Sequence, residues 1–262
     1  GLRTSTPLVG GILVSSTVFT LFTTMILLRG LGPNPNWAGA IWFLLAGVCA
    51  TGPGRLLFQF SIKRIGVSRA SVLLTVTPLF SMMIAVVFLG ERPGWPLVAG
   101  AMLIVLGIMN VIGDRSGIRV ELRAAVLGLI PALFYSLSPV FSRLGIEAIP
   151  DRLLGNALTA LGVLIFMFSS PPLIPKENRW KVNPYKLWIF PVGGIVYAMA
   201  FYAFYTTIAL SSVSFSTPLI HTMGLFSALI SRILFQDLEQ VTGRLALSAI
   251  IVFLGVILIS KS

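Results

Sequence analysis

Long apolar runs alternate with short polar segments along almost the whole chain. A helix needs roughly 20 mainly apolar residues to cross the hydrocarbon layer of a membrane, and the runs are about that long. The acidic residues fall at the ends of the runs or between them. The pattern predicts nine membrane-spanning helices, near 6–28, 37–61, 68–89, 95–112, 122–142, 152–170, 187–209, 213–235 and 243–260.

The composition agrees with this pattern. Hydrophobic residues make up 56% of the chain and charged residues 10%, against about 25% charged residues in a typical soluble domain. The net charge of +11 comes from short basic clusters between the apolar runs, where membrane loops usually carry Lys and Arg, so we expect no nucleic-acid partner. The single cysteine, Cys49, allows no internal disulfide. We predict an all-α, polytopic membrane protein without a metal ion or other cofactor.

The chain also contains an internal repeat. Residues 67–91 and 213–237, paired at one offset, share Val67/Val213, Ser68/Ser214, Leu73/Leu219, Leu79/Leu225, Phe80/Phe226, Ser81/Ser227 and Ile84/Ile230. Both segments end in an acid, Glu91 or Asp237. We therefore interpret residues 1–113 and 121–262 as two copies of one repeat.

The second copy contains five predicted spans and the first only four. We expect a further helix upstream of Gly1, which would restore a 5+5 arrangement and which 1–113 lacks. An odd number of spans in each copy inserts the two copies in opposite orientations. The chain is then an inverted-repeat helix bundle, an architecture that places a binding site near the middle of the membrane.

The sequence around the first of these segments resembles a known family. "SRASVLLTVTPLFSMMIAVVFLGERPGW", followed by "GAMLIVLGI", is similar to the EamA-type members of the drug/metabolite transporter superfamily, through Thr77, Pro78, Gly90, Glu91, Gly100 and Gly107. The second copy departs from the pattern, with Gly224 in place of the proline and Gln236-Asp237 in place of Gly-Glu. The resemblance implies ten helices in two repeats and a carrier that works by alternating access through a central cavity. Orientation stays open, because the Lys and Arg count opposes the family's cytoplasmic termini.

Ionisable residues within membrane spans are costly and are therefore candidates for function. Arg55 follows Gly52-Pro53-Gly54, and we predict that Pro53 acts as a helix hinge. Gln59 lies one turn further on the same helix face. A cation and an amide beside a broken helix would bind an anionic or zwitterionic solute. The alternative is that Arg55 reaches along its helix to the membrane surface near Lys63.

His221 lies near the middle of its predicted span, on a small polar stripe that includes Thr217. An imidazole titrates near neutral pH and would suit a proton-coupled step, although a lone histidine also serves as an interhelical hydrogen-bond donor. Thr75 occupies the position of His221 in the first repeat and is its symmetry-related candidate. A third ionisable residue, Arg232, lies nearer the membrane edge and is interpreted as an anchor.

Aromatic residues in "VGGIVYAMAFYAFYTTIAL" would wall a pocket for an organic solute, or simply pack. Tyr197 and Tyr202 are the candidates there, with Tyr135 from "PALFYSLSP" opposite them. Pro78 is predicted to bend a cavity-lining helix as a second hinge. Glu91 and Asp237 are interpreted as caps for the free N–H groups at the start of a helix.

The function predicted from these features is a secondary transporter or exporter of small organic metabolites, such as amino acids or amphipathic solutes. The alternative is a non-transporting membrane scaffold or partner subunit derived from a transporter. An enzyme is not expected, because the spans carry no carboxylate pair and only His221 could serve as a base. Besides the solute and the lipid bilayer, a homodimer partner is left open. The expected location is the cell membrane, the inner one where there are two.

Overall fold

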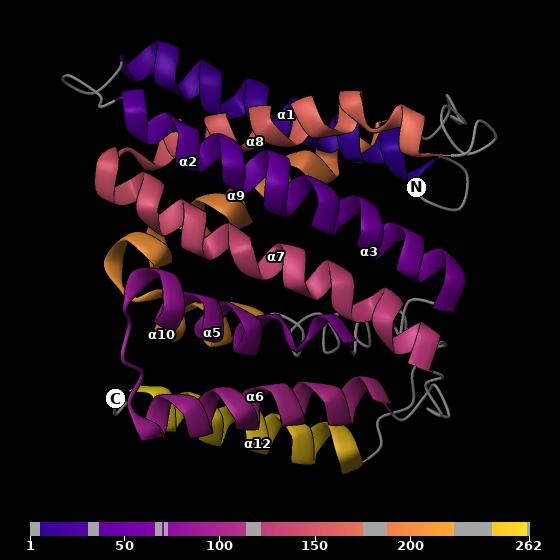
Figure 1. Cartoon of the computed structure of the whole chain (residues 1–262), viewed down its shortest axis with the longest axis vertical. Coiled ribbons are helices and arrows are strands. Elements are labelled where there is room, and N and C mark those ends of the chain that lie inside the picture. Colours follow the sequence, from indigo (N-terminus) through magenta and orange to yellow (C-terminus); the bar gives the residue numbers. More distant parts are fainter. Residues whose placement is uncertain are drawn as a thin grey trace. The chain divides into compact units, whose positions relative to one another are not determined.

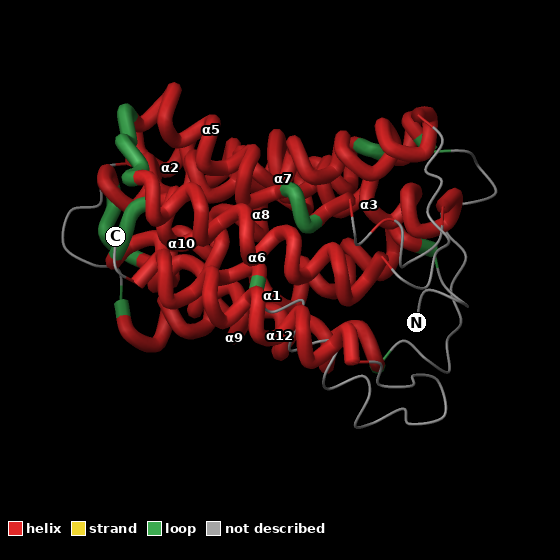
Figure 2. Tube along the Cα trace, turned by 90° about the horizontal axis from the view of Figure 1, so that it is seen from below, coloured by secondary structure: helices red, strands yellow, loops and turns green. Residues whose placement is uncertain are grey.

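The computed structural model describes residues 6–30, 37–65, 70, 73–113, 122–174, 188–222 and 243–260. Within these ranges the chain is helical, with short connecting loops and no strand (Figures 1 and 2). The helices are α1 (Pro7–Arg29), α2 (Ala40–Leu45), α3 (Gly52–Ile65), α5 (Thr77–Leu89), α6 (Trp95–Gly113), α7 (Leu122–Ala148), α8 (Arg152–Ser169), α9 (Ile189–Leu210), α10 (Val213–His221) and α12 (Gly243–Ser260). Three short helices are η1 (Trp37–Gly39), η2 (Ala46–Thr51) and η3 (Pro171–Leu173).

The prediction of an all-α chain is confirmed. Every predicted span contains helix among its described residues. Five described stretches are long and apolar enough to cross a membrane, namely Pro7–Arg29, Trp37–Ile62, Leu129–Ala148, Arg152–Ser169 and Ile189–Leu210. The described helices Thr77–Leu89, Trp95–Asn110 and Ile250–Ile259 are also apolar but shorter.

The chain divides into two compact units that mix the two halves of the sequence. Unit 1 contains the described residues of 1–60 and 137–210, and unit 2 contains those of 61–136 and 211–262. The first part of α7 therefore belongs to unit 2 and its second part to unit 1.

In unit 1, α1 packs against both α8 and α9 (Figure 1). The first pair is antiparallel, since Gly11 contacts Met167 at one end and Arg29 pairs with Asp151 at the other. The second pair is parallel, because Phe22 of α1 stacks on Tyr202 of α9 while the earlier Gly10 contacts Phe190. A buried apolar cluster joins α1, α3 and α8 through Leu8, Leu56, Val163, Met167 and Ile174.

A close helix crossing in this unit joins η2 to α8 through two glycines. A Cβ atom on Gly47 would lie 2.3 Å from the carbonyl oxygen of Thr159 and 2.7 Å from the Cα of Gly162. A Cβ atom on Gly162 would meet the carbonyl oxygen of Leu44 at 2.6 Å. Small residues allow membrane helices to approach to backbone contact, where van der Waals packing stabilises the pair.

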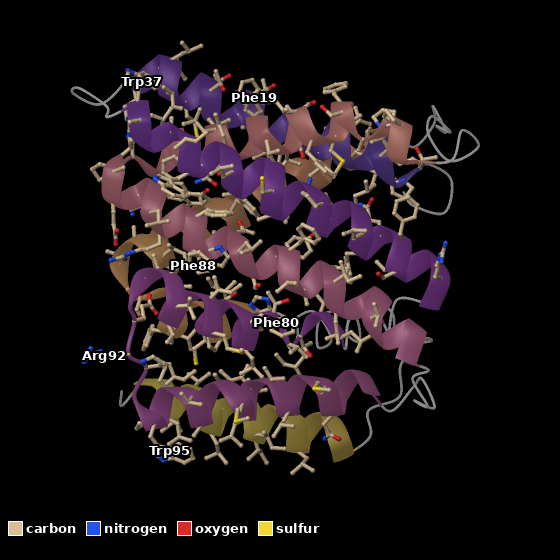
Figure 3. All side chains as sticks on the ribbon, in the orientation of Figure 1. Phe19, Trp37, Phe80, Phe88, Arg92 and Trp95 are labelled. Atoms are coloured by element: carbon tan, nitrogen blue, oxygen red, sulfur yellow. The ribbon has the colours of Figure 1, made fainter. Side chains whose placement is uncertain are left out.

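In unit 2, the connection between α5 and α6 turns at a left-handed glycine. Gly90 has φ +66°, and the N–H of Glu91 donates to the carbonyl of Ala85, so the last turn of α5 closes as a C-terminal cap. Figure 3 shows Arg92 in this connection pointing away from the helices, with Trp95 at the start of α6. The Gly-Glu-Arg sequence thus ends one helix and begins the approach to the next.

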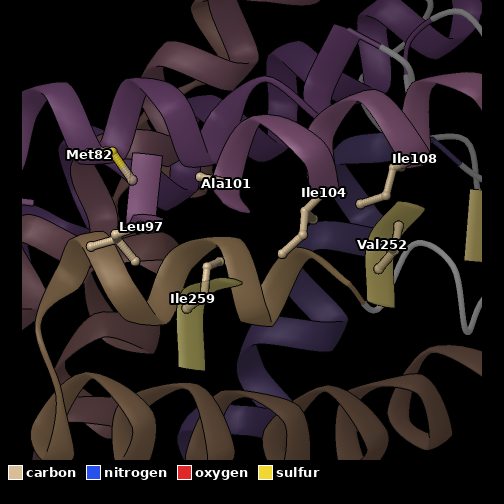
Figure 4. Packing of buried hydrophobic residues seen from close by; sticks show 7 residues of the cluster. All are labelled: Met82, Leu97, Ala101, Ile104, Ile108, Val252 and Ile259. Carbon is tan, nitrogen blue, oxygen red and sulfur yellow. The ribbon is translucent and has the colours of Figure 1, made fainter. Parts of the chain in front are cut away.

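The core of unit 2 lies between α6 and α12, which run antiparallel and side by side (Figure 1). Figure 4 shows the buried residues between them. Met82, Leu97, Ala101, Ile104, Ile108, Val252 and Ile259 form one buried cluster. Gly100 and Gly255 face each other, and a Cβ on Gly100 would lie 2.6 Å from the carbonyl oxygen of Gly255. The lack of a side chain at Gly100 thus allows α6 to pack closely against α12.

The start of α5 differs from the single span predicted over 68–89. Residues 75–76 form a turn, and α5 begins at Thr77 with Pro78 in its first turn. Proline lacks an N–H, which makes it unfavourable inside a helix but well suited to the first helical positions, where no intrahelical acceptor is available. Pro78 therefore marks a helix start in this structure, and its role as a hinge stays a prediction.

Candidate functional site

A π-helical turn precedes the candidate arginine. The six residues of η2 lie between α2 and α3, and the N–H of Gly52 donates to the carbonyl of Gly47, five residues earlier. Pro53 follows and has no N–H to donate to the carbonyl four residues before it. The wider turn accommodates this missing hydrogen bond, and such turns often occur at functional sites. The irregular helical turn is η2, which ends two residues before Pro53, the residue predicted to act as a hinge.

Arg55 points into unit 1 and not along α3 towards the membrane surface. It is buried, with 8% of its surface exposed, and its Nη1 donates to Ser15 Oγ of α1 at 2.8 Å. Its guanidinium carbon lies 4.6 Å from the ring centre of Tyr197 of α9, a cation–π distance. Ser15 and Tyr197 each lie near the middle of their helices, so the charge is held at a central level of both.

Arg55 lines a small cavity among α1, α3, α8 and α9. The volume is about 10 Å³, enough for about one water molecule. Thr51 lies one turn before Arg55 in the same wall, and its hydroxyl bonds with Ser138 of α7 at 3.0 Å. The complete lining is Ser15, Val18, Thr51, Arg55, Thr159, Ala160, Val163, Tyr197 and Phe201. In this conformation the cavity is smaller than an organic solute.

Gln59 offers a second polar group one turn beyond Arg55. Its side-chain oxygen Oε1 is buried and has no hydrogen-bond partner in the part of the chain that the structure describes. A buried acceptor without a partner is costly, so such a group is a candidate for binding a donor. Arg55 and Gln59 together present a cation and an acceptor on one face of α3.

A buried hydroxyl network lies behind this cavity. Tyr205 of α9 is fully buried, and its hydroxyl accepts a hydrogen bond from Ser142 of α7 at 3.1 Å and also bonds with Thr159 of α8. Thr159 in turn donates to the carbonyl oxygen of Phe43 in α2 at 3.1 Å. Four helices of unit 1 are therefore tied together by one tyrosine and its neighbours.

Tyr202 does not join Arg55. It is 40% exposed, stacks on Phe22, and lines a separate cleft between α1 and α9. The guanidinium carbon of Arg152, the first residue of α8, lies 5.9 Å from its ring centre. Of the two tyrosines predicted in this segment, only Tyr197 contacts the candidate arginine.

The remaining candidates lie in unit 2. Thr217 is buried and donates its hydroxyl to the carbonyl of Val213 at 2.9 Å, while Nδ1 of His221 lies 2.9 Å from the carbonyl of Thr217. Both side chains therefore bond with the backbone of α10 itself. Thr75 is buried in the turn before α5, and Tyr135 is half-buried on α7. The predictions at Gly224, Arg232, Gln236 and Asp237 lie outside the described residues.

Comparison with known proteins now decides the family. The sequence profile of the EamA-like transporter family matches residues 4–113 and 122–261, which together make up nearly the whole chain. The chain belongs to the EamA-like transporter family. No curated protein gives a match. Among solved structures, one crystal structure, of a protein described no further, gives TM-score 0.77 at 18% identity, covering 98% of this chain and 88% of the other. At this identity the similarity establishes the fold alone.

As an EamA-like transporter, the chain is an integral membrane protein of helical, polytopic type, from a family of transporters and not of enzymes. The resemblance inferred from Thr77, Pro78, Gly90 and Glu91 is thereby confirmed. Sequence reasoning missed Ser15, which accepts the hydrogen bond of Arg55, and the buried hydroxyl groups of Thr51, Thr159 and Tyr205. The sequence does contain a signal for this network, because Ser and Thr side chains recur within otherwise apolar spans. That pattern alone does not show which of the hydroxyl groups face each other.

Proposed function

We propose that this EamA-like transporter is a secondary carrier of small organic metabolites that bear a carboxylate, either anionic or zwitterionic. It moves its solute across the cell membrane by alternating access through a central cavity. The observation that carries the proposal is the buried guanidinium of Arg55, held by Ser15 and Tyr197 at the middle of α1 and α9. A charge at that depth is expensive, and the usual reason for keeping one is an ion or solute pathway.

Gln59 refines the solute class. Its buried oxygen without a partner is an acceptor for an ammonium or hydroxyl group, while Arg55 is a donor for a carboxylate. A solute bearing both groups, such as an amino acid, would use both side chains. The cavity beside Arg55 has to enlarge to admit such a solute, and π-helical η2 beside Pro53 is the proposed site of that rearrangement. In unit 2, Thr75, Tyr135, Thr217 and His221 are further proposed solute contacts.

Uptake into proteoliposomes tests the proposal. Labelled anionic, zwitterionic and cationic metabolites are offered to vesicles containing the full-length protein, Arg55→Gln, Arg55→Lys or Gln59→Leu. We expect saturable uptake of carboxylate-bearing solutes, abolished in Arg55→Gln and weakened in Arg55→Lys, with Gln59→Leu impairing zwitterions more than simple anions. The matched control is Arg92→Gln, which removes an exposed arginine from the α5–α6 connection.

Two outcomes would count against the proposal. Uptake of cationic solutes alone, unchanged in Arg55→Gln, would place the site elsewhere. Absence of flux above that of empty vesicles for all three classes, with folded protein in the membrane, would favour the non-transporting scaffold. That alternative has one observation in its favour, the small volume of the cavity beside Arg55.

A further inference from the structure

A large cleft lies in unit 1, between α1 and α9 and beside the start of α8. Its volume is about 640 Å³, within the range of roughly 300–1,000 Å³ that small-molecule sites occupy. Leu21, Phe22 and Met25 form the α1 wall, and Ile195, Met199 and Tyr202 are prominent in the α9 wall. All but Tyr202 are purely apolar. The cleft is separate from the cavity beside Arg55, and no residue lines both.

Of the five described candidate membrane spans, the two that line the cleft, α1 and α9, have the smallest buried share. Within the most apolar window of each span, 28% of α1 and 22% of α9 is buried, against 50–56% in the other three described candidate spans. Side chains in the walls are correspondingly exposed, including Met25 at 51% and Met199 at 71%. Apolar surface of this extent in a membrane span is suited to contact with acyl chains.

One end of the cleft carries an arginine whose charge is not neutralised by the described carboxylates. Leu153 lines the cleft, and the preceding Arg152 places its guanidinium over the ring of Tyr202. Asp151 pairs with Arg29 and caps α8 by accepting the N–H groups of Leu153 and Leu154.

The other two described carboxylates are also engaged elsewhere. Glu147 pairs with Arg143, and Glu91 accepts backbone N–H groups of α10. In the described part of the chain, Arg152 therefore has only a neutral polar partner in addition to the Tyr202 ring, the hydroxyl of Thr206 at 3.4 Å. With respect to the described carboxylates, the guanidinium is available to bind an anion.

We propose that this cleft is a binding site for an anionic phospholipid. One acyl chain lies between α1 and α9, and the lipid phosphate binds the guanidinium of Arg152 where α8 begins. The chemistry of the two parts matches: an apolar groove suited to an acyl chain ends at the cation of Arg152, where the apolar helix α8 begins. The site goes beyond solute transport, because it binds a component of the bilayer itself.

Native mass spectrometry of the full-length protein tests the proposal. Delipidated protein is titrated with phosphatidylglycerol or phosphatidylcholine carrying the same acyl chains, and the first bound lipid is quantified. We expect the wild type to prefer phosphatidylglycerol. Arg152→Gln should weaken phosphatidylglycerol binding about fivefold, since a basic residue near the membrane surface contributes about 1 kcal/mol. It should weaken phosphatidylcholine binding less, because the positive choline group offsets the charge of the phosphate. Arg152→Lys should retain the preference, and Arg92→Gln is the matched control for the loss of one charge.

A second variant tests the cleft independently of the charge. Met199→Trp fills the α9 wall and should reduce binding of both lipids, whereas Met102→Trp, at a residue on α6 that is 52% exposed, should not. Equal affinity of the wild type for the two lipids would overturn the proposal, and so would an unchanged preference in Arg152→Gln. A cleft covered by a second copy of the chain would instead give lipid-free dimers that Met199→Trp separates, and that result would also overturn it.

Discussion

The carboxylate of Glu91 accepts the backbone N–H of Val213 at 2.7 Å, although the two residues are 122 positions apart in the chain. Its second oxygen accepts the N–H of Ser214 at 2.8 Å. The N–H of Phe215 donates to Ser212 Oγ, and that of Ser216 to the carbonyl of Ser212. All four amides at the start of α10 are thus satisfied, two of them by a side chain from the α5–α6 connection.

Replacing Glu91 should therefore destabilise the protein through α10. In Glu91→Gln an amide nitrogen replaces one acceptor, and one helix N–H group loses its partner. We expect the free energy of unfolding, measured in mixed micelles, to fall by about 1–3 kcal/mol. Glu147→Gln is the matched control, because its exposed pair with Arg143 should contribute less than about 0.5 kcal/mol. Equal losses in the two variants would contradict the capping role.

The glycine crossing of η2 and α8 makes a second prediction. Gly47→Ala places a methyl group against the carbonyl of Thr159, which belongs to a helix backbone and cannot move aside cheaply. We expect a loss of about 1–3 kcal/mol in unfolding free energy and a lower yield of folded protein. Gly193→Ala is the control, since nothing lies within 4 Å of the Cβ it would add. A Gly47→Ala protein as stable as Gly193→Ala would show that the two helices are further apart.

Removal of the hydroxyl oxygen of Tyr205 should destabilise the protein, because this atom bonds with both Ser142 and Thr159. Tyr205→Phe keeps the packing of the ring against Phe43 but leaves Ser142 and Thr159 without their shared partner. We expect a loss of about 1–3 kcal/mol in unfolding free energy, because buried polar groups without partners carry their full desolvation cost. Tyr202→Phe, at a 40% exposed position, should change stability by less than about 0.5 kcal/mol.

The contact between Ser15 and Arg55 makes a prediction for transport. Ser15→Ala removes a hydrogen bond that fixes the guanidinium, and such a bond typically contributes about 1 kcal/mol. If Arg55 binds the carboxylate, the KM for uptake should rise about fivefold with Arg55 still present. Thr17→Val is the control on the same helix, because the Thr17 hydroxyl bonds only to the carbonyl of Leu13 in its own helix among the bonds described. An unchanged KM in Ser15→Ala would separate Ser15 from solute binding.

Much of the fold could be predicted from the sequence because membrane insertion imposes a simple rule. A span must be long, apolar and helical, so the runs around Pro7–Arg29 or Ile189–Leu210 reveal themselves by length alone. The capping role of Glu91 was also predictable, since a carboxylate between two spans can accept the free N–H groups at the start of a helix. Its partner was not, because nothing local links the α5–α6 connection to Val213.

The site was harder to predict because its chemistry depends on which helix faces meet. Arg55 and Tyr197 were candidates for separate reasons, and the structure brings them together. Tyr202, only five residues from Tyr197, lies on another face of α9 and contacts Arg152 instead. In an apolar span, periodicity says little about which face is inside, since lipid-facing and buried positions are equally hydrophobic. The repeat boundaries at 1–113 and 121–262 stay a prediction.

Each unit combines residues from both halves of the sequence, so neither unit can be completed until the second half of the chain has been synthesised. α1 enters the membrane well before α8 and α9 have been made, so Ser15 and Arg55 remain in an incomplete unit until Tyr197 emerges. At roughly 5–20 residues per second, the 122 positions between Glu91 and Val213 take the ribosome about 6–24 s. We expect the carboxylate that will cap α10 to stay in contact with water throughout that interval, because burying it without a partner would be costly. This would hold the α5–α6 connection at the membrane surface until α10 is made.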